Sequence, residues 1–186
     1  MIKSIPKAIF MAHCFMPSAF FAMLNHQQIT LNKELIRAVN VRDTTAASNL
    51  INRKADVNTR DDYHSTPLMH AAFSGDTECL GILLEKQADI NAYNRYGKTS
   101  LMFAIHANKN KSIAFLLEKK SDTTIQKNGR DTALIWAARS GNPLSIQLLL
   151  DHGADRNAQN SNGETAHRIA TLWDHPDCVK LLRHNN

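Results

Sequence analysis

Aromatic residues and cysteines are scarce in this chain. Among 186 residues, 6% are aromatic and three are cysteines, whereas 43% are hydrophobic. This composition favours one helical array rich in alanine and leucine over two globular domains. No tract rich in proline, glycine or serine divides the sequence, so we predict no interdomain linker.

A large excess of one charge is also missing. The formal net charge is +5, and removal of Lys3 and Lys7 at the N-terminus lowers it to +3. Basic residues such as Arg53 and Lys54 are scattered among acids, so no continuous stripe for phosphate groups is expected. We therefore predict that nucleic acid is not a partner.

Residue patterns typical of enzymes do not occur in the sequence. Gly97-Lys98-Thr99 resembles the end of a phosphate-binding loop, but Ala92 stands where the required earlier glycine should be. The nine histidines form no ligand pattern with cysteines or carboxylates, and His70 occupies a helix position that faces neighbouring residues. We expect no enzymatic activity, no cofactor and no metal.

An internal repeat is the strongest positive feature. Thr66, Thr99, Thr132 and Thr165 recur at intervals of 33 residues. A threonine hydroxyl can accept a hydrogen bond from a free N–H group at the start of a helix, and Pro67 suits the first helical position. Each threonine therefore predicts the beginning of a short helix.

The remainder of the unit predicts a second helix that lies antiparallel to the first. In the unit that starts at Thr66, Gly75 ends the first helix and Asp76 caps the second. Leu83 and Leu84 mark the buried face of this second helix. Because one unit cannot bury its apolar face alone, the units must stack into a solenoid.

These features resemble ankyrin repeats. The residues that carry the resemblance are Thr66-Pro67-Leu68, Ala71-Ala72, the Gly75 turn, the double leucine and Ala88-Asp89-Ile90-Asn91. The resemblance implies an all-α ankyrin-repeat solenoid of about five stacked helix-turn-helix repeats with short β-turn or hairpin tips. The predicted ankyrin-repeat domain spans residues 25–186, with repeats near residues 31–60, 61–93, 94–126, 127–159 and 160–186.

The third unit matches this pattern least well. Ile105 occupies the position of Ala72, and Asn108 occupies the position of Gly75. The stability of a solenoid is approximately the sum of the intrinsic stabilities of its repeats and the interaction energies between neighbouring repeats. We therefore expect local opening to begin in this unit or at the ends of the array.

Two cysteines occupy the same position in the second and fifth units, Cys79 and Cys178. Stacked helices lie about 8–10 Å apart, so three stacking steps separate these residues by roughly 30 Å. Bridged Cα atoms lie within about 7 Å of one another. We therefore predict two free thiols, buried or half-buried, and cysteine usage does not identify the redox compartment.

Residues 1–24 differ from the repeats, and we predict that they form a signal peptide or hydrophobic segment. Lys3 and Lys7 precede an uncharged, mostly apolar run over residues 8–24, which resembles a secretory signal peptide. The cleavage site is poor, because Phe20 stands at the third position back from a cut after Ala22. An uncleaved membrane anchor and an ordinary disordered or docked extension are the alternatives.

We accordingly expect an exported protein, periplasmic or secreted, with no stable membrane insertion after cleavage. A cytoplasmic or anchored protein is the alternative localisation.

The resemblance also implies a function. Ankyrin-repeat proteins hold protein partners with the turn tips before each threonine and with the exposed side of each first helix. The chain is therefore expected to be a non-catalytic module, monomeric by itself, that binds a protein on its concave face. It would act as an inhibitor or antidote of an enzyme, or as a secreted factor that engages host proteins. The alternative is a structural helper that stabilises or localises a periplasmic enzyme or assembly.

Twelve residues at the tips and on the first helices are the predicted partner-binding residues. They are Asp62, Tyr63, Ser65, Phe73, Arg95, Tyr96, Lys98, His106, Asn128, Asp131, Arg139 and Trp173. Tyrosine, tryptophan and arginine are residue types that tend to anchor interfaces.

Overall fold

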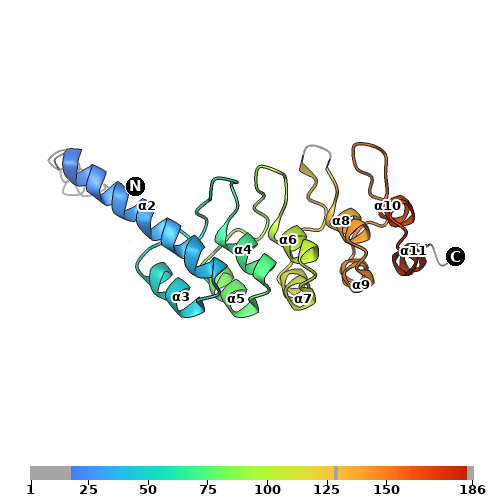
Figure 1. The fold of residues 1–186 in the computed structure, drawn as a ribbon, viewed down its shortest axis with the longest axis horizontal. Helices are drawn as coiled ribbons and strands as arrows, with labels where there is room; N and C mark the ends of the chain where they lie inside the picture. The colour runs from blue at the N-terminus through green and yellow to red at the C-terminus, as the bar shows by residue number, and fades with distance from the viewer. Residues whose placement is uncertain (1–17, 128–129, 184–186) are drawn as a thin grey trace, which may run out of the picture.

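The computed structural model describes residues 18–127 and 130–183. Its helices follow one another in pairs, as Figure 1 shows, and confirm the predicted all-α solenoid of five stacked helical units. The helices are α2 (Ser18–Asn40) and α3 (Thr44–Asn52), α4 (Pro67–Ser74) and α5 (Thr77–Glu85), α6 (Ser100–His106) and α7 (Asn110–Glu118), α8 (Ala133–Ser140) and α9 (Pro143–Asp151), and α10 (Ala166–Leu172) and α11 (Pro176–Leu182).

Helices α4, α6 and α8 begin where the sequence predicts, and α4 and α8 also end at the expected glycines. Thr66, Thr99 and Thr132 precede α4, α6 and α8, and each hydroxyl accepts a hydrogen bond from the N–H three residues later. Gly75 and Gly141 end α4 and α8 with φ angles of +82° and +64°. Such left-handed conformations favour glycine because it has no Cβ.

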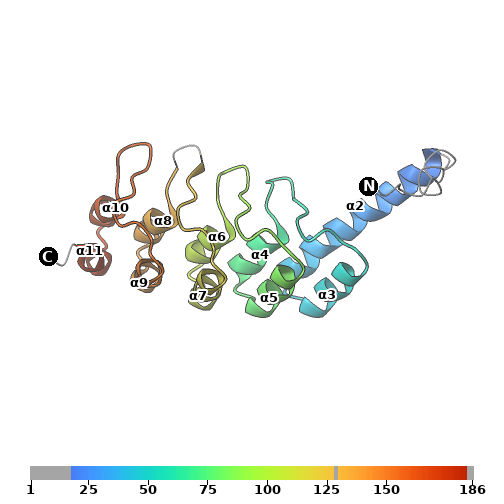
Figure 2. The ribbon, with the colours of Figure 1, turned by 180° about the vertical axis from the view of Figure 1, so that it is seen from behind.

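Helix α2 is longer than the others and projects beyond the array at its N-terminal end (Figures 1 and 2). Leu31, Leu35 and Val39 in its second half are buried, whereas residues 22–30 are exposed. The predicted boundary between residues 24 and 25 falls inside this continuous helix, and residues 1–17 of the predicted signal segment lie outside the described residues. In the described part of the chain, no helix combines the length and apolar character that a membrane span requires.

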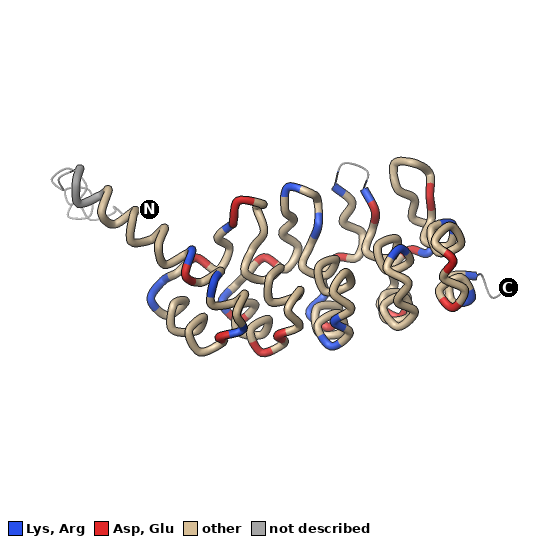
Figure 3. The backbone as a smooth tube through the Cα atoms, viewed as in Figure 1, with Lys and Arg blue, Asp and Glu red and all other residues tan. Residues whose placement is uncertain are grey.

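Four tip loops stand on one side of the helices (Figure 1). Their described residues are 60–65, 93–98, 126–127 with 130–131, and 159–164. Charged residues are distributed unevenly among them, as Figure 3 shows. The first loop carries neighbouring acids, whereas basic residues dominate the second and third loops.

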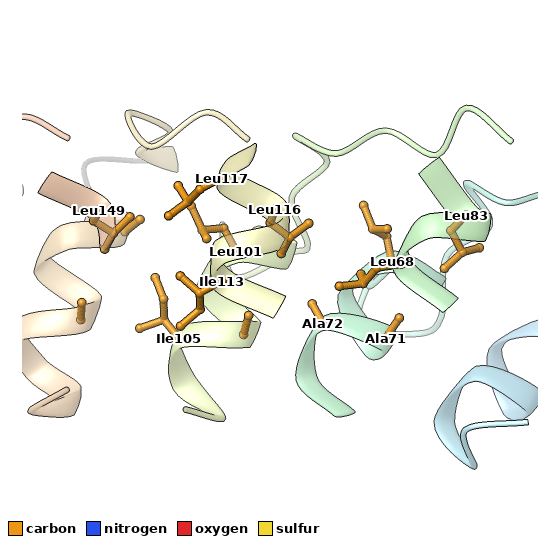
Figure 4. Close-up of a cluster of buried hydrophobic side chains, with 14 of the residues drawn as sticks. Leu68, Ala71, Ala72, Leu83, Leu101, Ile105, Ile113, Leu116, Leu117 and Leu149 are labelled. Atoms are coloured by element: carbon orange, nitrogen blue, oxygen red, sulfur yellow. The ribbon is translucent and has the colours of Figure 1, made fainter. Parts of the chain in front are cut away.

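One continuous hydrophobic core lies between the first and second helices. Leu83, Leu116 and Leu149 occupy the same position of successive units and are fully buried (Figure 4). Ala71 and Ala72 on α4 are also fully buried, and their small side chains let a neighbouring helix approach closely. The apolar face of each unit is therefore covered by its neighbours.

Asparagine side chains in the turns link the first three units to one another. Asn58 Oδ1 accepts a hydrogen bond from the Asp89 N–H at 2.8 Å, and Asn91 Oδ1 accepts one from the Asp122 N–H at 2.9 Å. Thr124 occupies the same position in the third unit, and its hydroxyl bonds to Asp122 Oδ1 at 2.7 Å instead. Within the described residues, this series of bonds does not continue to the fourth unit.

Cys79 and Cys178, the two cysteines within the described residues, are buried and unpaired, as the repeat spacing predicts. Burial raises the pKa of the Cys79 thiol to about 12 and also raises the pKa of Cys178. Both side chains therefore stay protonated at neutral pH, where a thiol is a poor nucleophile.

Candidate partner-binding surface

Three of the tip loops are closed by a single polar side chain at the loop base. In the first loop, Asp61 Oδ1 accepts hydrogen bonds from the N–H groups of Tyr63 and Ser65, both at 2.8 Å. Asn94 and Asn160 make the equivalent pairs in the second and fourth loops. These bonds fix the backbone, so the tip side chains stand on a preorganised turn.

The first loop is also tied to its helix. His70 Nε2 on α4 lies 2.9 Å from Asp61 Oδ2, and both side chains are largely buried. His70 thus has a polar partner within the chain, in agreement with the packing position predicted for it.

Tyr63, Arg95 and Tyr96 form one cluster across the first and second loops, which we call the tip cluster. The two tyrosine rings stack with centroids 6.4 Å apart, and the Arg95 guanidinium carbon lies 4.3 Å from the Tyr63 centroid and 4.9 Å from the Tyr96 centroid. Arg95 Nη2 also donates to Tyr96 Oη at 2.7 Å. The rings remain 53% and 43% exposed, so the cluster is both ordered and accessible.

A second row of rings runs along the first helices. Phe73 on α4 contacts Phe103 edge-on and stacks on His106, with centroid distances of 6.3 and 6.4 Å. His106 in turn meets Trp136 edge-on at 6.0 Å, and Lys98 Nζ lies 4.2 Å from the Trp136 centroid. We call Phe73, Phe103, His106 and Trp136 the inner row.

Phe103 and Trp136 belong to this row although they were not among the predicted binding residues. They occupy the same repeat position as His70, which indicated packing against neighbours. The structure leaves both side chains half-buried and in contact with Phe73 or His106. Phe103 lies three residues before His106, which places both on one face of α6, and this spacing is the sequence signal that could have identified the position.

Arg139 and Asp131 bind each other. Arg139 Nη2 and Nε donate to Asp131 Oδ2 at 2.6 and 3.1 Å, and the two side chains are 29% and 12% exposed. Asp131 Oδ1 accepts a further bond from Asn160 Nδ2 at 2.8 Å. Removal of Arg139 would leave the largely buried Asp131 carboxylate without its cationic partner, so this pair stabilises the loop in the unbound protein.

Ser65 is a correction to the predicted set, because it is only 3% exposed. Its hydroxyl accepts a hydrogen bond from Asn94 Nδ2 of the second loop at 3.3 Å. Ser65 therefore joins two neighbouring loops and has no surface for a partner. Of the other predicted residues, Asp62 and Trp173 are exposed, and Asn128 lies outside the described residues.

A hollow of about 230 Å³ lies where the second, third and fourth loops meet α8. Tyr96, Lys98 and Arg130 line it from the loops, and Trp136 lines it from the helix. Burial of the Lys98 ammonium group and the neighbouring positive charge of Arg130 lower the pKa of Lys98. Loops and first helices thus share one recessed surface, and its centre is positively charged.

This surface offers rings and cations for contact with another molecule. In the chain as described, no group of three histidine, cysteine, aspartate or glutamate residues is arranged to hold a metal ion. A family model for ankyrin repeats, which comprises three copies of the repeat, matches residues 35–127 and 115–186. A search of curated proteins finds no match to the chain.

Proposed function

This chain belongs to the ankyrin-repeat family, and we propose that it is a non-catalytic module that binds a protein partner through the tip cluster and the inner row. Ankyrin repeats in general mediate interactions between proteins. The identity of the contact residues within this chain is our proposal.

The single observation that carries the proposal is the exposure of large rings that the fold does not need to bury. Phe73 is 48% exposed and Trp173 is 54% exposed. Phe73 stacks on His106 of the inner row, and the Arg139 guanidinium carbon lies 5.7 Å from the centroid of the Trp173 ring. Large rings and arginine dominate the energetics of protein interfaces. Because contacts with neighbouring rings already restrict these side chains, binding costs less conformational entropy than it would for free side chains.

We further propose that the bound partner is inhibited, as by an antidote of an enzyme or by a secreted factor that engages host proteins. The alternative is a helper that stabilises or localises a periplasmic enzyme or assembly. The two roles differ in one measurable respect: an inhibitor lowers the activity of its partner when the chain is added, whereas a helper preserves that activity.

Export is part of this proposal. It is supported by the uncharged apolar run that follows Lys3 and Lys7, which is typical of a signal peptide. Intact-mass measurement on the protein from its native host should show the loss of about two dozen N-terminal residues. Recovery of the full-length chain from the cytosol would contradict export and would leave the binding proposal intact.

The binding proposal can be tested with two triple variants. The first is Tyr63→Ala/Phe73→Ala/Tyr96→Ala, which removes exposed rings. The control is Glu85→Ala/Lys86→Ala/Lys119→Ala, which changes exposed residues at the ends of α5 and α7. A partner is first isolated with the unmodified chain from its native compartment and is then titrated against each variant.

We expect the ring variant to lose about 2 kcal/mol or more of binding free energy if it includes a true anchor. The control should bind like the unmodified chain, because surface changes away from a contact have small effects. Melting temperatures of both variants would show that each remains folded. Loss of binding in the control alone would place the partner on the second helices and refute the proposal.

A further inference from the structure

The second and third tip loops carry four cations, which we call the central basic patch. Its members are Arg95, Lys98, Lys127 and Arg130. Among the described residues, none of the four forms a salt bridge. Figure 3 shows this concentration of basic residues on the two central loops.

The one acid in these two loops does not balance the patch. Asp131 uses Oδ2 to bind Arg139 and Oδ1 to accept from Asn160 Nδ2. Asp131 and Arg139 also line the hollow beside α8, but both carboxylate oxygens of Asp131 already have partners, and neither oxygen forms a salt bridge with Lys98 or Arg130 among the described residues. The charges of Lys98 and Arg130 remain without a counterion from the described chain.

Lys98 and Arg130 both line the hollow beside α8. The ammonium group of Lys98 lies over the Trp136 ring, and its pKa is lowered by burial and by Arg130. Two like charges are thus held near each other at a partly desolvated site. An incoming carboxylate would relieve this repulsion and gain charge-assisted hydrogen bonds in return.

We propose that the partner presents a short acidic segment, and that one of its carboxylates binds in the hollow between Lys98 and Arg130. This inference rests on the proposed function and specifies the partner's chemistry. The Trp136 and Tyr96 rings give the same segment an apolar surface beside the charged site.

The flanks of the patch favour a short protein segment over a nucleic acid. Asp62 is exposed on the first loop. On the fourth loop, a hydrogen bond from the Asn160 side chain lowers the pKa of Glu164, so this carboxylate is ionised at neutral pH. A nucleic acid carries closely spaced phosphates along its whole length, and its backbone needs a continuous basic track. Acids on both sides of the patch interrupt such a track.

The test uses the full chain and a phage-displayed library of random linear peptides. Selection should enrich peptides rich in aspartate and glutamate, and their affinity should fall as salt screens the charges. The Lys98→Glu/Arg130→Glu variant should bind these peptides about tenfold more weakly or worse, because like charges then face each other. The control, Lys86→Glu/Lys119→Glu, makes the same change in net charge at the ends of α5 and α7 and should bind normally.

Melting temperatures would verify that both variants fold, and Lys98→Gln/Arg130→Gln replaces the first variant if charge reversal unfolds the loop. Acid-rich peptides that bind the reversed variant as well as the unmodified chain would overturn the inference. Peptides without an acidic excess that depend on Tyr63, Phe73 and Tyr96 would also overturn it, while leaving the proposed binding function in place. A random oligonucleotide that binds more tightly than the peptides, and displaces them, would assign the patch to nucleic acid instead.

Discussion

Lys120→Gly should stabilise the protein, because Lys120 follows α7 in the left-handed conformation with φ of +62°. Gly153 occupies the same position one unit later with φ of +79°. The left-handed conformation destabilises the folded state by roughly 1–2 kcal/mol for a residue with a Cβ. Glycine avoids this strain, but its greater backbone freedom in the unfolded chain costs about 0.5–1 kcal/mol on folding. The expected net gain is therefore about 0.5–1 kcal/mol.

Lys119→Gly is the matched control. Lys119 is also an exposed lysine and directly precedes Lys120, but its φ is −79°. Glycine at position 119 adds the entropy cost of folding but relieves no backbone strain, so Lys119→Gly should destabilise the protein by about 0.5–1 kcal/mol.

Thermal and urea unfolding of the two variants measure this contrast. For a chain of this size, 1 kcal/mol corresponds to about 2–4 °C in Tm, so Lys120→Gly should melt above Lys119→Gly by a few degrees. Equal melting temperatures, or a lower one for Lys120→Gly, would refute the argument from backbone strain.

Three further changes test the packing and the links between units. Thr124→Asn should restore the missing hydrogen bond to the fourth unit and raise the free energy of unfolding by about 0.5–1.5 kcal/mol. Amide exchange in α7 should slow as a result, and unchanged exchange would show that the junction between the third and fourth units is not a weak point. Leu149→Ala should cost roughly 2–5 kcal/mol in urea unfolding because it leaves a cavity in the core, and a loss below about 1 kcal/mol would mean that the helices close around it. Burial raises the pKa of Cys79 to about 12 from an ordinary value of 9.0, so stability from this group is complete below pH 9 and declines as pH rises toward 12. Thiol labelling at pH 8 should accordingly modify Cys79 only as fast as the structure opens, and rapid labelling of the folded chain would contradict its burial.

The fold could be predicted from the sequence because its determinants are local and repeated. Thr66 and Gly75 start and end a helix through contacts within a few residues, and the same chemistry recurs every 33 residues. Leu83 and Leu149 then follow as buried positions by periodicity alone. The repeat thus specifies the order of helices and the face that each one buries.

The candidate contact surface was only partly predictable, because neighbouring units decide which side chains stay exposed. Ser65 has the polarity of a surface residue, but Asn94 of the next loop, 29 residues away, covers it. Arg139 on α8 binds Asp131 in the loop before this helix. The pair forms because the loop turns back toward the helix, and sequence spacing does not reveal how the loop and the helix are oriented. Tyr63 and Tyr96 were placed correctly on the tips, whereas their stacking with Arg95 depends on the distance between adjacent loops.

Amide hydrogen exchange of the full chain, alone and in complex with the partner isolated from its native compartment, tests the central claim most directly. We predict that the partner slows exchange in the tip loops at residues 60–65 and 93–98 and in the C-terminal ends of α4, α6 and α8. Exchange in α5, α7 and α9 should change little. Protection confined to α5, α7 and α9, with the tip loops unchanged, would contradict the assignment of the partner to the tip cluster and the inner row.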